Sequence, residues 1–118
     1  MAGERETRDY HPCEHDGIRR ATAILGRKWH PLLITTLLTD GPLGFNELKA
    51  RLDGISDKVL SECLDELQEA GLVTREVIDD KPVRVEYSLT AAGEALQPVI
   101  DQLREWSREH LGTAETGA

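Results

Sequence analysis

The sequence predicts a mainly α-helical domain with one small β-hairpin, an α+β fold, and three observations support this prediction. Apolar residues recur at helical spacing over residues 56–70. This period ends at Gly71, and two short runs of β-type residues follow over 72–89, separated by turn-forming residues. A shorter amphipathic stretch over 44–52 precedes the long helix and is joined to it by a turn.

Two helices are expected before this unit. The first covers residues 16–25, with Asp16 as its N-cap. The second begins near Lys28 and runs to Leu38, because Pro31 is tolerated only in the first turn of a helix. Trp29 is expected to anchor this second helix by packing.

The third and fourth helices are the centre of the prediction. Residues 44–52 form the third helix, and the turn 53–55, which contains a glycine, suits a helix-turn-helix connection. Ser56 is the expected N-cap of the fourth helix because its hydroxyl can accept from a first-turn amide, and Gly71 fits a left-handed residue after its end. The expected core residues are Phe45, Leu48, Leu52, Leu60, Leu64 and Leu67.

A hairpin and a last helix complete the chain. Residues 72–78 and 83–89 are the expected strands, and the charged turn 79–82 joins them. The last helix is expected to follow Thr90, its N-cap, and to continue to Leu111. A helix-turn-helix followed by a charge-tipped hairpin is a winged helix-turn-helix, and the helices at the two ends of the chain are additional to it.

A winged helix-turn-helix binds double-stranded DNA by placing the first turns of its second helix in the major groove. The expected groove-facing residues are therefore Ser56, Asp57, Lys58, Ser61 and Glu62. The expected phosphate contacts are Lys28, Lys49, Arg51, Lys58, Arg75, Lys81 and Arg84. In the hairpin, Arg75 and Arg84 have an alternative, which is pairing with Glu76 or Glu86 across the strands.

A family resemblance is carried by four segments, ILGRKWHPLLI, GPLGFNEL, GISDKVLSECLDELQEAGLVTREV and PVRVEYSLTAAGEAL. From about Cys13 to Trp106 the chain resembles the HxlR family of winged-helix transcriptional regulators. The resemblance implies a dimeric DNA-binding regulator, with a cysteine near the N-terminus in many members. The chain departs from the family at Leu43 and Gly44, where many members carry basic residues, and at Glu62, where glutamine is common.

The charge balance is unusual for a DNA-binding protein. Fourteen Lys and Arg residues stand against 22 Asp and Glu, a net charge of -8, and only four of the basic residues are lysine. Few lysines and dispersed acidic residues are typical of adaptation to a high-salt cytoplasm. At about 1 M salt the Debye length is about 3 Å, so remote carboxylates repel phosphate little. DNA binding then requires the cations to gather on one flank of the fold.

Two other function classes are weighed against DNA binding. The first is a winged-helix interaction module that no longer binds DNA, which the acidic residues of the fourth helix favour. The second is an enzyme, which the sequence does not support because it contains no catalytic triad pattern, phosphate-binding glycine loop or metalloprotease helix. No cofactor is expected, and an effector is left open.

Cys13 is the candidate for redox sensing, because the HxlR resemblance places a sensing cysteine just before the first helix. Neighbouring arginines favour its thiolate, whereas neighbouring acidic residues oppose it, and an unreactive cysteine is the alternative. Alternating donors at His11, Cys13 and His15 raise the question of a metal site. Their spacing matches no strong zinc motif, so no metal is expected.

Apolar residues at helical spacing in both terminal helices indicate a surface that a partner subunit covers, and the resemblance implies a homodimer. The alternative is packing of these helices on their own chain. The expected interface residues are Ile18, Ile24, Leu25, Leu96, Val99, Ile100, Leu103 and Trp106.

One domain is expected over residues 13–111, between a mobile arm over 1–12 and a flexible tail over 112–118. Two cysteines are too few for a disulfide framework, and no segment has the length of a membrane span or the apolar region of a signal peptide. The sequence therefore predicts a cytoplasmic protein.

Overall fold

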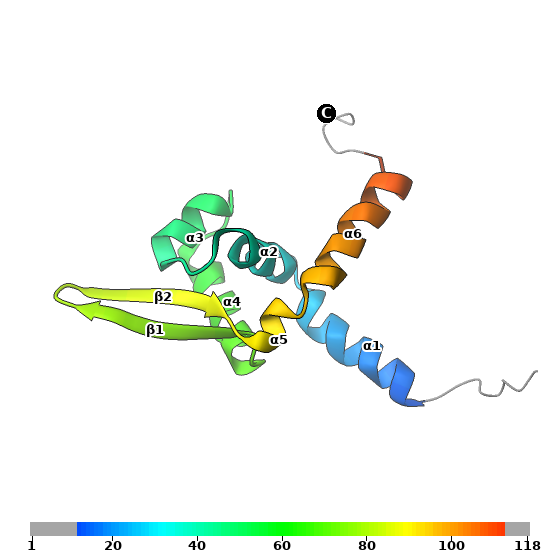
Figure 1. The fold of residues 1–118 in the computed structure, drawn as a ribbon, viewed down its shortest axis with the longest axis horizontal. Coiled ribbons are helices and arrows are strands. Elements are labelled where there is room, and N and C mark those ends of the chain that lie inside the picture. The colour runs from blue at the N-terminus through cyan, green and yellow to red at the C-terminus, as the bar shows by residue number, and fades with distance from the viewer. Residues whose placement is uncertain (1–11, 113–118) are drawn as a thin grey trace, which may run out of the picture.

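The structure is a computed structural model that describes residues 12–112, with side chains from His15 onward. Along the chain lie α1 (Pro12–Leu25), α2 (His30–Asp40), α3 (Phe45–Arg51), α4 (Asp57–Glu69), β1 (Val73–Asp80), β2 (Val83–Leu89), α5 (Ala91–Glu94) and α6 (Gln97–His110). The hairpin projects from one side of the α2–α4 unit, and α1 and α6 project from the other (Figure 1). The predicted order of helices and hairpin is confirmed.

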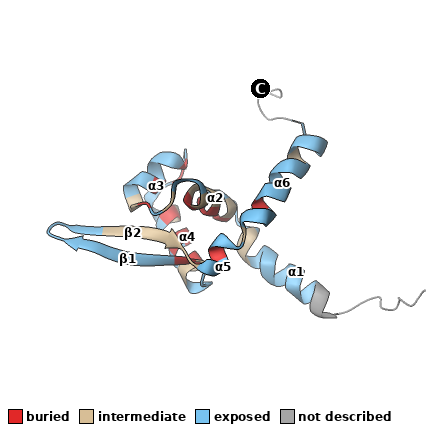
Figure 2. Cartoon of the chain, viewed as in Figure 1, coloured by how far each residue is buried: buried red, intermediate tan, exposed pale blue. Residues whose placement is uncertain are grey.

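The core lies between α2, α3 and α4, and the leucine face of α4 is its centre. Ser56 Oγ accepts a hydrogen bond from the Val59 amide at 3.1 Å, so the predicted N-cap is confirmed. The predicted inward residues are buried or, for Phe45, partly buried against the core. The fully buried side chains are Leu33, Ile34, Leu48, Leu60, Leu64 and Leu67. Figure 2 shows this burial concentrated where the three helices meet.

The hairpin is antiparallel and is joined to the helical core through Leu43. The backbone of Leu43 exchanges two hydrogen bonds with Tyr87, at 3.0 and 2.8 Å. β1 continues to Asp80, so the turn is shorter than the predicted 79–82. An irregularity between Val77 and Asp79 shifts the register and places Asp79 opposite Arg84, where opposite charges stabilise the pair.

The first two helices begin elsewhere than predicted. α1 begins at Pro12, since proline suits the first turn of a helix, and Asp16 therefore lies inside the helix and is not its N-cap. α2 begins at His30, with Trp29 as N-cap, and Lys28 lies in the preceding turn. Trp29 packs partly buried against the core, which confirms its role as an anchor.

The predicted last helix is two helices. Thr90 Oγ1 accepts from the Gly93 amide at 3.1 Å and caps α5 as predicted. The chain then bends at Ala95 and Leu96, because Pro98 has no amide proton to bond the carbonyl of Glu94 and can stand only in the first turn of a new helix. This bend directs α6 away from the hairpin (Figure 1).

Two segments of the predicted domain plan fall largely outside the structure. Apart from Pro12 and Gly112, the arm over 1–12 and the tail over 112–118 lie outside the described residues. Within residues 12–112, each helix is too short or too polar to cross a membrane.

Gly93 lies in α5, just before the bend at Ala95, and its backbone packs closely against Leu72 and Leu89. Its replacement tests the packing of α5. A Cβ atom at Gly93 would collide with the carbonyl oxygen of Leu72 and press on the Leu89 side chain. We therefore expect Gly93→Ala to lower the free energy of unfolding by about 1–3 kcal/mol, measured by urea denaturation. Gly17→Ala is the matched control, because a Cβ there meets no atom and should stabilise α1 by up to about 1 kcal/mol. Equal effects of the two changes would contradict this packing.

Candidate nucleic-acid interface

The first half of α4 presents a polar face to solvent, opposite its leucine face. Lys58, Ser61 and Glu62 are exposed, as are Ser56 and Asp57 at the helix start. The hydroxyl oxygen of Ser56 is engaged by the N-cap bond, but its proton is still available for donation. All the predicted groove-facing residues are therefore accessible on one helix end.

Two cations of the helix-turn-helix are engaged by carboxylates. Lys49 Nζ lies 2.7 Å from Asp57 Oδ1, which links the end of α3 to the start of α4. Arg51 Nε donates to Asp40 Oδ2, also at 2.7 Å. The sequence predicts phosphate contacts for both Lys49 and Arg51, and in the structure both are paired with carboxylates.

The hairpin carries both paired and unpaired cations. Arg84 Nη2 lies 3.7 Å from Glu86 Oε2, so the pairing that the sequence left as an alternative is present. Arg75 lies opposite Tyr87 in the register and is exposed. Among the residues that the structure describes, Lys58, Arg75 and Lys81 form no ion pair. These three cations occupy the start of α4, β1 and the hairpin turn.

Lys28 is placed differently from the other expected phosphate contacts. Its ammonium lies 5.0 Å from the centroid of the Trp29 ring, in cation–π contact range. Because it precedes α2 instead of opening it, its charge does not lie within the helix. The contact with Trp29 gives its position a structural reason.

The terminal helices divide the predicted interface residues into two groups. Ile24, Leu25, Leu96 and Ile100 pack against the chain's own core, and Ile100 is only 5% exposed. The exposed group consists of Ile18, Val99, Leu103 and Trp106. Figure 2 shows α6 and most of the described part of α1 as exposed over nearly their whole length.

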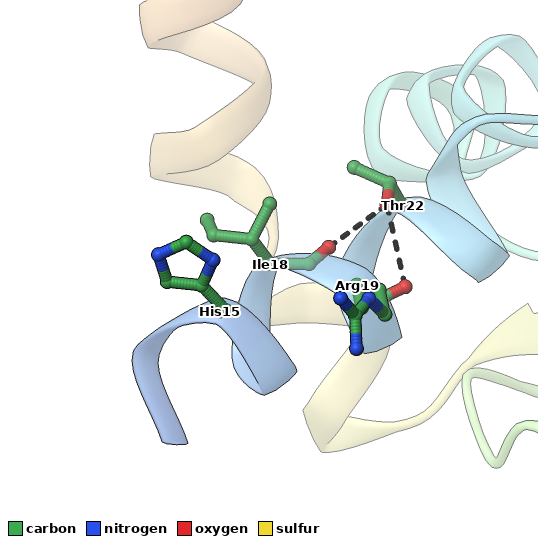
Figure 3. Close-up of a pocket in the computed structure, with 4 residues that line it drawn as sticks. All are labelled: His15, Ile18, Arg19 and Thr22. Atoms are coloured by element: carbon green, nitrogen blue, oxygen red, sulfur yellow. Dashed lines mark hydrogen bonds between the residues drawn. The ribbon is translucent and has the colours of Figure 1, made fainter. Parts of the chain in front are cut away.

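Each terminal helix carries a shallow hollow at its exposed apolar residues. On α1 the hollow is lined by His15, Ile18, Arg19 and Thr22, and Figure 3 shows Thr22 hydrogen-bonded to the carbonyls of Ile18 and Arg19. On α6 the hollow is mostly apolar. Its lining residues are Pro98, Val99, Gln102, Leu103 and Trp106.

A polar network next to α4 is not predicted from the sequence. His30 is 2% exposed and is hydrogen-bonded both to the carbonyl of Ile24 and to Glu66 of α4. Arg27 Nη1 lies 3.2 Å from the other carboxylate oxygen of Glu66. A histidine beside Pro31, at the start of an otherwise apolar helix, is the signal in the sequence that could have indicated a buried polar contact.

The two cysteines differ in what the structure describes. Cys63 is buried in α4, where burial raises the pKa of its thiol, Glu66 raises it further, Arg27 lowers it and Glu62 raises it. Cys13 lies in the first turn of α1, but its side chain, like all of His11, is outside the described residues. Among side chains 15–112, His, Cys, Asp and Glu form no cluster suited to a metal ion.

Comparison with known proteins identifies the family. The family model of the HxlR-like helix-turn-helix matches residues 24–115. The chain belongs to this family. It is 43% identical to the HTH-type transcriptional regulator YvaP of Bacillus subtilis over 78% of this chain and 84% of YvaP.

Two solved structures resemble the fold closely. The reduced form of the transcriptional regulator YodB from B. subtilis has a TM-score of 0.72 and 37% identity, covering 80% of this chain and 91% of YodB. The redox regulator HypR in its reduced form has a TM-score of 0.75 and 33% identity, covering 85% of this chain and 98% of HypR.

This membership decides between the function classes. The HxlR relatives are transcriptional regulators with a helix-turn-helix, so this chain is a DNA-binding transcriptional regulator and not an enzyme. The interaction module without DNA binding is the disfavoured alternative.

The Lys49–Asp57 pair yields a prediction about DNA affinity. Asp57→Asn should free Lys49 to contact phosphate and should remove a nearby negative charge. DNA affinity should therefore rise by about 2- to 5-fold, and the slope of log affinity against log salt concentration should steepen by about 1. Fluorescence anisotropy over a salt series measures both quantities. Asp101→Asn on α6 is the matched control and should leave both unchanged. Identical salt slopes for the two variants would show that Lys49 stays away from the phosphates.

Proposed function

We propose that the protein binds a pseudo-palindromic operator as a homodimer, with α4 in the major groove and the β1–β2 hairpin on the phosphate backbone. The observation that carries this proposal is the accessible polar end of α4, with Lys58 unpaired beside Ser61 and Glu62. Its opposite face is held by three fully buried leucines, so the helix presents this end rigidly. The cytoplasmic location expected from the sequence is part of the same proposal.

The hairpin supplies the backbone contacts in this proposal. Lys81 at the turn and Arg75 on β1 are exposed and free of ion pairs with other described residues. Arg84 is weakly held, because its 3.7 Å distance to Glu86 is long and its side chain is 61% exposed. Phosphate can therefore compete with Glu86 for Arg84.

Because the chain carries a net charge of -8, the proposal includes the salt concentration at which the protein binds DNA. We infer that direct base contacts contribute more than counterion release, as suits a chain with net charge -8 in concentrated salt. DNase footprinting on the DNA upstream of the protein's own gene, at low and at molar salt, tests DNA binding. Protection is expected at one or both salt concentrations, and protection at neither would favour the interaction module.

Glu62 is the residue expected to set base preference. A carboxylate can accept from the amino group of cytosine but cannot make the two-sided contact of glutamine with adenine. Glu62→Gln should therefore change the selected consensus site and not merely weaken binding. Selection from a random pool of DNA duplexes with wild type and variant measures this. Identical consensus sequences would show that Glu62 does not contact a base.

The homodimer is proposed through the exposed apolar residues of the terminal helices. Val99, Leu103 and Trp106 lie on one side of α6 and are between 43% and 54% exposed. Ile18 of α1 is 68% exposed. Burial of these side chains by a second copy would place two recognition helices about one turn of DNA, about 34 Å, apart.

A charge in this surface should separate the subunits. Leu103→Glu is expected to convert a dimer into a monomer at micromolar concentration, because the carboxylate would be desolvated in the interface. Size-exclusion chromatography with light scattering measures the mass. Val83→Glu is the control and should remain dimeric, because Val83 is an exposed apolar residue on the hairpin, away from the terminal helices. A Leu103→Glu dimer of unchanged stability would place the interface elsewhere.

Redox sensing by Cys13 is proposed as the regulatory input. Solved structures of similar proteins include quinone-bound YodB from B. subtilis and the redox regulator HypR in its oxidized form, so redox regulation is known among the neighbours of this fold. The other cysteine, Cys63, is buried with a raised thiol pKa, which disfavours its thiolate. Cys13 is thus the proposed sensor, forming a disulfide between two subunits when an oxidant such as peroxide accepts the two electrons.

This proposal predicts a dimer band on non-reducing gels after peroxide treatment of the wild type. Cys13→Ser should give no such band, whereas Cys63→Ser should behave as the wild type because its thiol is buried. Addition of dithiothreitol should abolish the band. Peroxide-treated wild type that remains monomeric on the gel would end the proposal.

A further inference from the structure

His30 is the buried polar side chain of the described core, and it lies where three segments meet. Its Nδ1 is 2.7 Å from the carbonyl oxygen of Ile24, in the last turn of α1. Its Nε2 is 3.0 Å from Oε1 of Glu66, in the middle of α4. His30 is the first residue of α2, so its ring connects α1 and α4 to the start of α2.

The hydrogen bonds of this ring require one extra proton. A backbone carbonyl only accepts, so Nδ1 must donate to Ile24. An ionised carboxylate also only accepts, and its second oxygen is ion-paired with Arg27 at 3.2 Å, so Nε2 must donate to Oε1 as well. Either His30 is an imidazolium or Glu66 holds the proton on Oε1, and in both cases one proton lies between Nε2 and Oε1.

Loss of this proton would disrupt the contact. A lone pair on Nε2 would then face a carboxylate oxygen at 3.0 Å, inside a site where the ring is 2% exposed and has little access to water. Glu66 is 38% exposed on its outer side, so the proton can exchange with solvent through the carboxylate. The link between α2 and α4 therefore depends on pH.

The link acts on the helix that the proposed function places in the major groove. Glu66 lies one helical turn after Glu62, on the same rigid α4. Ile24 lies at the end of α1, the helix proposed to contact a second subunit. His30 therefore helps to fix the orientation of α4 relative to α1, and so relative to the proposed dimer.

We propose that His30 is a positioning residue for operator recognition, holding α4 against α1 and α2 through the proton that it shares with Glu66. This inference rests on the proposed function. It predicts that operator affinity falls when a rise in pH removes the proton shared by Nε2 and Oε1.

The charged and titratable groups near the ring come from two segments. Arg27, in the turn before α2, and Glu66, on α4, form the network itself. Glu62 and Cys63 lie nearby on α4. Burial raises the pKa of the Cys63 thiol, so this thiol keeps its proton between about pH 6 and about pH 8.5. α1 contributes only the carbonyl of Ile24 to the contacts of the ring.

Operator affinity measured against pH tests the inference. A fluorescein-labelled duplex carrying the consensus selected from the random pool is titrated at constant salt between about pH 6 and about pH 8.5. The wild type should lose affinity by about 5-fold or more over this range, a typical coupling between two sites. His30→Gln should bind more weakly at pH 6 and show a flat profile.

Glu66→Gln is the conservative variant that distinguishes positioning from mere packing. Its amide can donate to an unprotonated Nε2 of His30, which restores the hydrogen bond without the shared proton. Its affinity should therefore match the wild type at pH 6 and stay high at pH 8.5. Because Glu66 is partly exposed, this variant carries the test even if His30→Gln fails to fold.

His110→Gln is the matched control for the general effect of histidine charge on DNA binding. His110 is exposed at the end of α6 and should leave the pH profile unchanged. A flat wild-type profile, or a Glu66→Gln profile as steep as that of the wild type, would overturn the role of His30 alone. Wild type that binds no duplex at any pH would overturn the proposed function as well.

Discussion

The rest of the structure depends on the burial of one leucine face of α4. Leu60, Leu64 and Leu67 are each at most 1% exposed, and burying each such side chain contributes about 1.5–3 kcal/mol. With this face fixed in the core, the opposite face of the first two turns must point to solvent, since a helix turns about 100° per residue. The hairpin, α3 and α2 are then arranged around the same leucines, so one constraint sets both the core packing and the exposure of the residues proposed to contact DNA.

Electrostatics act against this arrangement more than they support it. Lys49 and Arg51 are held by Asp57 and Asp40, and Arg84 lies between acidic residues, so several cations of the winged region are already neutralised. Surface pairs of this kind stabilise a fold by only about 0–1 kcal/mol, but they reduce the positive field that phosphate meets. In the proposed complex, recognition then depends on a few unpaired cations and on base contacts made from α4. Such a surface is suited to concentrated salt, where long-range repulsion is screened.

The His30 network connects this recognition surface to the rest of the molecule. The aliphatic core fixes α4 by packing alone, and a buried hydrogen-bonded ring adds a contact that has few alternative arrangements. Through Ile24 and Glu66, the end of α1 and the middle of α4 are held by the same side chain. If Cys13 senses an oxidant as proposed, this ring is the contact through which a change in α1 would reach α4.

The sequence by itself determined the element order, the leucine face of α4, the caps at Ser56 and Thr90 and the family, because these follow from periodicity, local hydrogen bonding and motif spacing. It did not determine where α1 and α2 begin or that Pro98 divides the last helix, since several start positions satisfy the same local rules. Only the tertiary structure decided which cations are neutralised, which apolar residues of the terminal helices face the core, and that His30 meets Glu66. These contacts join residues distant in sequence, and their distances depend on how the helices pack, which a linear pattern does not encode.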